Sequence, residues 1–159
     1  MTDRVPADVV RPATADDAGA AGRMLFDVNT EFEESTPSPE FLSSRFRVLV
    51  DRDDVLVLLS GERGRESGFA FVTLRPTPYR HGPVALLEEL YVVPDRRGGG
   101  LGTALLLAAI DHVRERGSAE MQINVDEEDV DARRFYERHG FHTTTPGSDS
   151  MMLFYERPL

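Results

Sequence analysis

A glycine-rich turn between an apolar strand and an apolar helix is the segment of this sequence best suited to chemistry. Residues 90–103 read Leu-Tyr-Val-Val-Pro-Asp-Arg-Arg-Gly-Gly-Gly-Leu-Gly-Thr. Such a turn aims several backbone N–H groups at one point, and the helix N-terminus adds its dipole, so the turn can bind an anion. Arg96 and Arg97 add local positive charge. We therefore interpret the turn as a phosphate-binding site, the alternative being a flexible connection.

The spacing within this turn excludes two common phosphate-binding motifs. A Walker A loop requires Gly-Lys-Ser/Thr, whereas this turn ends in Gly102-Thr103-Ala104. A dinucleotide-binding turn requires Gly-x-Gly-x-x-Gly, and neither register of the glycines supplies the last one. The pattern that fits is Arg97-x-x-Gly100-x-Gly102.

The elements that must position this turn are those of an α/β domain. Hydrophobic patterning predicts strands over 9–12, 55–60, 68–74, 84–93 and 121–125, with closing strands over 141–145 and 151–155. Helical spacing and capping residues predict helices that begin near Thr14, at Pro39 and at Gly100, and a fourth over 130–139. We expect a mixed sheet with helices packed on it. Because no repeat or linker divides the chain, we expect one domain over residues 1–159.

Composition narrows the classes of partner. The chain has 159 residues, 18 basic and 28 acidic side chains, a net charge of −10 and no cysteine. The acidic balance argues against a nucleic acid or an anionic membrane surface as partner, and the longest apolar run, residues 104–110, is too short for a membrane span. The absence of cysteine excludes a thiolate metal site and a cysteine nucleophile, and it fits a cytoplasmic protein. The histidines lack ligand partners nearby in sequence, so we predict no metal site.

Two segments in order resemble the motifs of the GNAT superfamily of N-acetyltransferases. The first, Arg97-x-x-Gly100-x-Gly102, resembles the family's coenzyme-A-binding motif. The second, residues 129–141, resembles the family's Asn-x-x-Ala-x-x-x-Tyr-Glu-x-x-Gly-Phe. The resemblance covers roughly residues 8 to 157. It implies an α/β fold with a mostly antiparallel sheet of six to seven strands, helices on both faces, and splayed parallel strands that form the acetyl-CoA cleft.

The resemblance implies acetyl-CoA as the cofactor and assigns the residues that bind it. The strand backbone would hold the pantetheine arm, and the amides of the turn would hold the pyrophosphate. The residues so assigned are Leu90, Tyr91, Val92, Arg97, Gly98, Gly99, Gly100, Leu101, Gly102, Thr103 and Asp129. Gly99 and Asp129 depart from the family, which often has Lys, Arg or Gln at the first position and usually Asn at the second. Leu90 and Val92 also suit plain sheet core.

A tyrosine and two acids near these motifs are the candidates for catalysis. Acetyl transfer to an amine needs a base, a stabilised oxyanion and a proton for the leaving thiolate. The resemblance places Tyr136 near the sulfur as proton donor, the alternative being an aromatic residue packed under its helix. Strand alternation sends the adjacent acids Glu88 and Glu89 to opposite faces, so one can enter the cleft as the base. The alternative is substrate recognition by one acid and pairing with an arginine by the other.

Acidic residues outside the motifs indicate the acceptor. Glu31, Glu33 and Glu34 follow the first helix, in a region that the family uses to line the acceptor site, and Asn124 and Asp126 lie on or just past the next strand. Acids here would attract a cationic amine, although a solvated acidic surface explains them at least as well.

We expect an N-acetyltransferase that acts directly on a primary amine of a small cationic molecule, aminoglycoside- or polyamine-like. The alternatives are a protein N-terminus or lysine as acceptor, or a non-catalytic acyl-CoA-binding or regulatory module. Related proteins often dimerise, which makes a homodimer an expected state.

Overall fold

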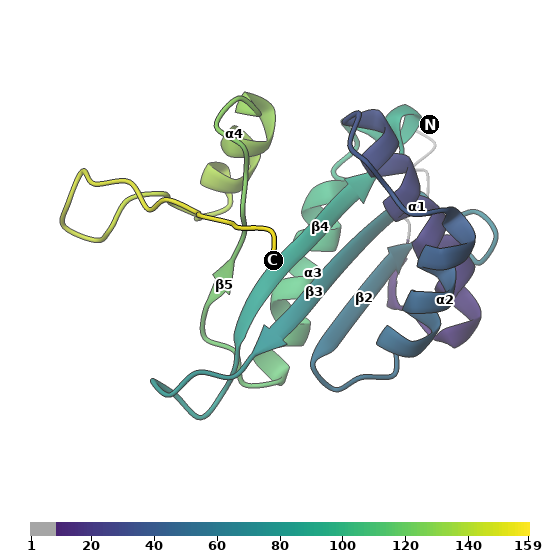
Figure 1. The fold of residues 1–159 in the computed structure, drawn as a ribbon, viewed down its shortest axis with the longest axis horizontal. Helices are drawn as coiled ribbons and strands as arrows, with labels where there is room; N and C mark the ends of the chain where they lie inside the picture. Colours follow the sequence, from purple (N-terminus) through teal and green to yellow (C-terminus); the bar gives the residue numbers. More distant parts are fainter. Residues whose placement is uncertain (1–8) are drawn as a thin grey trace, which may run out of the picture. The chain divides into compact units, whose positions relative to one another are not determined.

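Figure 1 shows the computed structural model of the protein, which describes residues 9–159. The chain divides into two compact units, Met1–Gln122 and Ile123–Leu159, and each is described by itself. In the described residues, the first unit contains the sheet and three α-helices, and the second contains one α-helix and the C-terminal segment. The single domain expected over residues 1–159 stays a prediction.

The sheet of the first unit has five strands among the described residues, in the spatial order β1-β2-β3-β4-β5. They are β1 (Val10–Pro12), β2 (Val55–Ser60), β3 (Gly68–Arg75), β4 (Val84–Val92) and β5 (Met121–Gln122). Neighbouring strands are antiparallel, except that β4 and β5 are parallel and pair at Ala85 with Met121 and at Leu86 with Gln122. The mixed, mostly antiparallel sheet expected from the sequence is confirmed.

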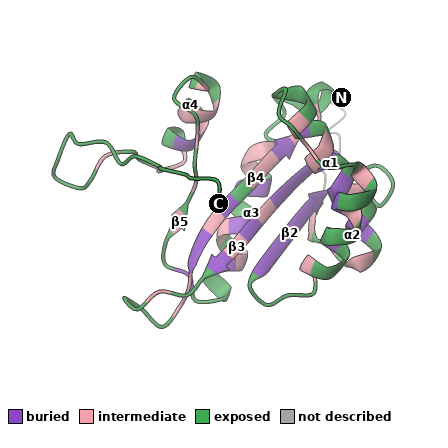
Figure 2. Cartoon of the chain, in the orientation of Figure 1, coloured by how far each residue is buried: buried purple, intermediate pink, exposed green. Residues whose placement is uncertain are grey.

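Helices cover both faces of this sheet, as expected. They are α1 (Ala18–Glu31), α2 (Pro39–Leu49) and α3 (Leu101–Glu115). On the face covered by α1 and α2, Phe46 lies edge-on to Phe69 and Phe71, with ring centroids 5.8 and 5.5 Å apart. On the other face, α3 packs so closely that a Cβ atom on Gly68 would come within 2.7 Å of Leu105 Cδ1. Strand β2 is buried along its whole length between these layers, as Figure 2 shows.

The helices of the first layer begin at capping signals in the sequence. Thr14 and Asp17 form a reciprocal capping box around a single 3₁₀ turn, and α1 follows directly. The Ser38 hydroxyl accepts a hydrogen bond of 3.1 Å from the Phe41 amide, and Pro39 is the first residue of α2. No helix in the described part of the chain has the length and apolar character needed to cross a membrane.

The second unit corrects the expected number of strands. Helix α4 (Val130–Arg138) forms close to its expected range. The closing strands expected over 141–145 and 151–155 do not form in the described residues, where a single antiparallel bridge joins Thr144 to Met151. The sheet therefore has five strands rather than six or seven, and the strand expected over 121–125 ends at Gln122. Apolar patterning reports a local preference for extended backbone, whereas a strand also needs a hydrogen-bonded partner.

Candidate functional site

The turn between β4 and α3 has the backbone geometry of an anion-binding loop. Gly98 and Gly100 have φ angles of 81° and 86°, a left-handed conformation that glycine adopts without strain. A side chain added at either position would meet nothing within 4 Å. The amides of residues 98–100 make no backbone hydrogen bond with any described residue, and those of Leu101 and Gly102 lie in the first helical turn, where no helix carbonyl precedes them. Unbonded N–H groups and open space thus meet at the start of α3.

Arg97, which we expected at the phosphate site, is bound to another predicted site residue. Its Nη1 and Nη2 atoms donate to Oε1 and Oε2 of Glu31 at 2.6 and 2.7 Å, which is a bidentate ion pair. Its Nε atom donates to the Val92 carbonyl at 2.9 Å, and its guanidinium lies 5.6 Å from the centre of the Tyr91 ring. Hydrogen bonding from Arg97 lowers the pKa of the Glu31 carboxyl, and the same bond raises the pKa of Arg97. Both groups are therefore charged and engaged with each other.

Strand β4 contains a bulge at its pair of acids. In the ladder with β3, Glu89 lies opposite Phe71, and the register then shifts so that Glu88 is the extra residue. Glu88 accepts a hydrogen bond of 2.6 Å from the hydroxyl of Thr73. Phe71 packs on the core beneath α1 and α2, and Thr73, two residues further, shares its face of the sheet. Both carboxylates therefore reach this face, and the bulge interrupts the alternation that would have sent them to opposite faces.

Glu89 is a half-buried carboxyl without a partner. Its side chain makes no hydrogen bond or ion pair with the residues that the structure describes. Burial raises its pKa, and the negative charges of Glu34 and Glu88 raise it further, to about 7. A carboxyl with a pKa near neutrality can take up and release a proton in each catalytic cycle. Glu89 is thus the predicted site residue whose titration suits a general base.

The predicted cofactor strand continues past its parallel neighbour. Leu90, Tyr91 and Val92 lie opposite Ala70, Phe69 and Gly68 of β3. On the other edge, the ladder with β5 ends at Leu86, while β4 runs on to Val92. Tyr91 is buried in the core beneath α1 and α2. One edge of this segment is therefore paired with β3, and the other edge has no ladder with β5. The contacts of these residues with a cofactor stay a prediction.

The remaining predicted residues belong to the second unit. They are Asn124 and Asp126, which are exposed, and Asp129 and Tyr136. The Asp129 carboxylate accepts a hydrogen bond of 3.0 Å from the Ala132 amide and so caps α4. Tyr136 is buried on α4, with its ring centroid 5.1 Å from that of Phe135 and 5.5 Å from that of Phe141. This packing agrees with a structural role, and the catalytic role of Tyr136 stays a prediction.

No local pattern in the sequence indicates the ion pair between Glu31 and Arg97. The two residues are 66 positions apart, and the sequence predicts the acceptor site for Glu31 and the cofactor site for Arg97. The bulge did have a signal, since two adjacent acids in an apolar strand are unusual in an undistorted ladder. The contact between the two predicted regions is therefore a finding of the structure.

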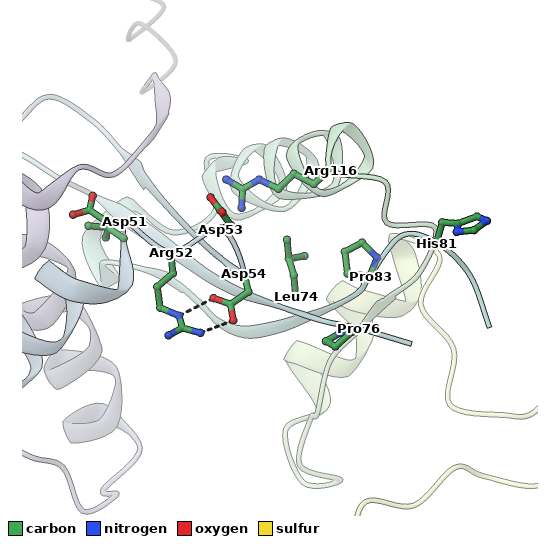
Figure 3. A pocket seen from close by; sticks show the side chains of 10 residues that line it. Asp51, Arg52, Asp53, Asp54, Leu74, Pro76, His81, Pro83 and Arg116 are labelled. Carbon is green, nitrogen blue, oxygen red and sulfur yellow. Dashed lines mark hydrogen bonds and ion pairs between the residues drawn. The ribbon is translucent and has the colours of Figure 1, made fainter. Parts of the chain in front are cut away.

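A separate pocket of about 600 Å³ lies where β2 and β4 begin and β3 ends. Figure 3 shows the side chains that line it. It is lined by Val50, Asp51, Arg52, Asp53, Asp54, Leu74, Pro76, His81, Pro83 and Arg116. Arg52 donates to both carboxylate oxygens of Asp54 at 2.7 and 2.6 Å, and Arg116 donates to the Val55 carbonyl at 3.0 Å. None of the predicted catalytic or binding residues lines this pocket.

A family model matches most of this chain. The model of the acetyltransferase (GNAT) family matches residues 23–141. The chain belongs to the GNAT family. The resemblance seen in Arg97-x-x-Gly100-x-Gly102 and in residues 129–141 is confirmed, and the family is one of acetyl-transfer enzymes.

Relatives of this GNAT protein include proteins of its own length. An aminoglycoside N(6')-acetyltransferase type 1 of Stenotrophomonas maltophilia is 31% identical over 161 residues, which cover 96% of this chain and 95% of the relative. A crystal structure from Arthrobacter sp. FB24, of a protein named as a candidate acetyltransferase, is 49% identical with a TM-score of 0.89 and covers 99% of both chains. A mycothiol acetyltransferase of Saccharomonospora viridis is 38% identical over 93 residues, 57% of this chain but only 30% of the relative.

Proposed function

We propose that this GNAT protein transfers an acetyl group from acetyl-CoA to a primary amine, with Glu89 as the general base. The observation that carries the proposal is the half-buried Glu89 carboxyl on β4, which has no hydrogen-bond or ion-pair partner among residues 9–159; burial and the charges of Glu34 and Glu88 raise its pKa to about 7. At neutral pH a large fraction of this group is ionised, so it can accept a proton from an ammonium group directly or through water. The glycine turn at the end of the same strand supports a phosphate-bearing donor, because it offers open space and unbonded N–H groups.

The proposed chemistry divides the proton transfers between two side chains. Bound acetyl-CoA would supply the acetyl group as a thioester, and the C–N bond would form before the C–S bond breaks, so that an oxyanion exists between the two steps. Glu89 takes up the proton that the amine loses, and Tyr136 donates a proton to the thiolate that leaves. A strand amide near Val92 would stabilise the oxyanion, in the manner of other acyl transfers. The products are an N-acetylated amine and coenzyme A.

We propose a small polycationic amine as the acceptor. The charges of Glu34 and Glu88 act on Glu89 and would attract a cation to the base. Glu31 is already paired with Arg97, so of the two acids predicted to bind the acceptor in this region, Glu31 and Glu34, Glu34 remains for this role. The relative of similar length that is named an aminoglycoside N(6')-acetyltransferase supports the same class of acceptor. The cytoplasmic location and the homodimer stay predictions.

A thiol-release assay over a panel of amines tests the reaction and the acceptor together. The panel contains aminoglycosides, polyamines and peptides with a free N-terminus or lysine, and calorimetry measures acetyl-CoA binding separately. We expect turnover with the polycationic small molecules and little with the peptides. Binding without turnover on any amine would favour the non-catalytic module, and no heat at millimolar acetyl-CoA would contradict both functions.

Replacement of Tyr136 tests the proposed proton donor. Tyr136→Phe keeps the ring that packs between Phe135 and Phe141 but removes the hydroxyl. We expect a kcat roughly 10²-fold lower, with acetyl-CoA affinity nearly unchanged, because proton donation to the thiolate is lost while the ring stays in place. Tyr79→Phe is the matched control, since this tyrosine is 90% exposed. Unchanged turnover in Tyr136→Phe would assign proton donation to another group.

A further inference from the structure

We propose that Arg97 is a positioning residue and not a phosphate ligand. Its ion pair with Glu31 fixes the segment after α1 against the end of β4, and so holds the charge of Glu34 beside Glu89. The importance of this for catalysis rests on the proposed function of Glu89 as base. All the residues involved lie within the first unit.

Three of the five N–H groups of the Arg97 guanidinium donate hydrogen bonds within the protein. The two terminal nitrogens bind the two oxygens of Glu31, and the third nitrogen binds the Val92 carbonyl. The planar fork of an arginine matches a carboxylate in this bidentate way, so the pair is geometrically specific. A bidentate contact with a phosphate through this fork would require Arg97 to release Glu31. The turn offers an anion its backbone amides without that cost, since the amides of residues 98–100 lack backbone partners among described residues.

The segment after α1 is a compact hydrogen-bonded turn. The Glu34 amide donates to the Asn29 carbonyl at 2.8 Å, and the Glu33 amide donates to the Thr30 carbonyl at 3.1 Å. Glu33 has a φ angle of 57°. These are the two bonds and the left-handed residue of a Schellman motif, which ends a helix in a fixed direction. Glu31 lies inside this motif, so a contact that anchors Glu31 also anchors Glu34.

The charge carried by this turn acts on the base. The charged groups that act on Glu89 are Glu34, from the turn after α1, and Glu88, from β4 itself. The neighbouring β3 strand presents Phe71 and Thr73 to this region, and neither is charged. Release of the turn would let the exposed Glu34 side chain move away from Glu89, and the solvent between them would screen the repulsion. The pKa of Glu89 would then fall from about 7 towards its ordinary value.

A double-mutant cycle tests this inference on the free protein. The variants are Glu31→Gln, Arg97→Gln and the combination, and the readouts are the carboxyl titration of Glu89 by NMR and the dissociation constant of acetyl-CoA by calorimetry. We expect each variant to lower the midpoint of the Glu89 titration by roughly half a unit to one unit, and the double variant to match the singles. We expect acetyl-CoA affinity to change by less than about threefold in all three.

The chain offers a matched control in the pocket of Figure 3. Arg52 and Asp54 also form a bidentate pair, through Nε and Nη2 of Arg52, and this pair lies where β2 begins and β3 ends. Arg52→Gln and Asp54→Asn should leave the Glu89 titration and the acetyl-CoA affinity unchanged. Arg97→Lys keeps the charge but loses the fork, so it should shift the titration as Arg97→Gln does.

Two results would overturn the inference. If Arg97→Gln weakens acetyl-CoA more than about tenfold while Glu31→Gln does not, Arg97 is a phosphate ligand. If the Glu89 titration stays unchanged in folded Glu31→Gln, the pair does not hold the charge of Glu34. Because this titration is measured without acetyl-CoA or an amine, it remains decisive even if no acetyl transfer is found. Glu31→Gln carries the test should Arg97→Gln fail to fold.

Discussion

Asp17 and Glu89 are two carboxyls withdrawn from water in the same unit, and their surroundings are opposite. Asp17 is 1% exposed and accepts hydrogen bonds from Arg11 at 2.9 Å, the Thr14 amide at 2.9 Å and Arg63 at 3.0 Å. Burial alone would raise its pKa, but these bonds hold it well below its usual range. Glu89 has no such bonds in the described chain, and two neighbouring carboxylates add to the effect of burial, so its pKa is about 7.

The difference shows that hydrogen-bond partners and neighbouring charges, and not burial alone, decide whether the pKa of a buried carboxyl is lowered or raised. Asp17 joins β1, the start of α1 and the turn after β2 through two arginines. It is permanently ionised at neutral pH and so contributes to stability. Glu89 has two acids for neighbours and changes protonation near neutral pH, which is costly for stability but suits a base.

The largest effect should come from removing the charge of Asp17. Asp17→Asn removes the buried anion that Arg11 and Arg63 share and leaves them their longer contacts with Glu66 at 3.5 Å and Asp16 at 4.0 Å. We therefore expect the free energy of unfolding to fall by about 3 kcal/mol, as for a broken buried ion pair. Urea unfolding followed by circular dichroism measures this loss. Asp54→Asn, which also loses a bidentate arginine partner but at an exposed site, is the control. An equally small change in both variants would contradict the structural role of Asp17.

Next in size should be the loss of activity in Glu89→Gln. Without the base we expect kcat/KM to fall about 100-fold, and its dependence on a group with a pKa near 7 to disappear. Steady-state kinetics between pH 5 and pH 9 provide the measurement. Glu88→Gln should cost less, because Glu88 is bound to the Thr73 hydroxyl. A larger loss in Glu88→Gln would reverse the assignment of the base.

The two carboxyls should also give stability opposite dependences on pH. The folded-state pKa of Glu89 is raised from 4.5 to about 7, so the folded state holds a proton that the unfolded state has lost, and stability falls as pH rises through this window. The free energy of unfolding of Glu89→Gln should therefore exceed that of the parent protein by about 1–3 kcal/mol at pH 8, and this difference should vanish below pH 4. Asp17 acts in the other direction. Because its pKa is lowered in the folded state, Asp17 contributes stability at pH values above the ordinary carboxyl pKa, and this stability is lost as the pH falls into the acid range.

Urea unfolding at several pH values separates these contributions. Glu40→Gln is a suitable control for Glu89→Gln, because Glu40 is an exposed acid in the first turn of α2. A gain at pH 8 that persists unchanged at low pH would show that packing of the amide, and not the titration of Glu89, explains the result.

Local signals in the sequence predicted most of the fold. Capping by Ser38 and Pro39 and the apolar spacing of α3 describe contacts within a few residues, and these elements formed as expected. The two closing strands needed hydrogen-bonded partners that local patterning does not specify, and they did not form in the described residues. The site divides in the same way. Gly98 and Gly100 adopt the expected loop, whereas the bulge at Glu88 and the pair of Glu31 with Arg97 depend on neighbours that no local pattern encodes.

The smallest effect should come from the turn that carries the charge of Glu34. Glu33 adopts a φ angle of 57°, which costs a non-glycine residue about 1 kcal/mol, so Glu33→Gly should stabilise the protein by about 0.5 kcal/mol after the entropy of the unfolded chain is counted. Glu33→Ala removes the same charge but keeps the strain, which makes it the control in thermal unfolding. Because Glu34 stays in place in both variants, the titration of Glu89 should not move. If alanine stabilises as much as glycine, repulsion among the acids, and not the backbone of the turn, limits stability beside the base.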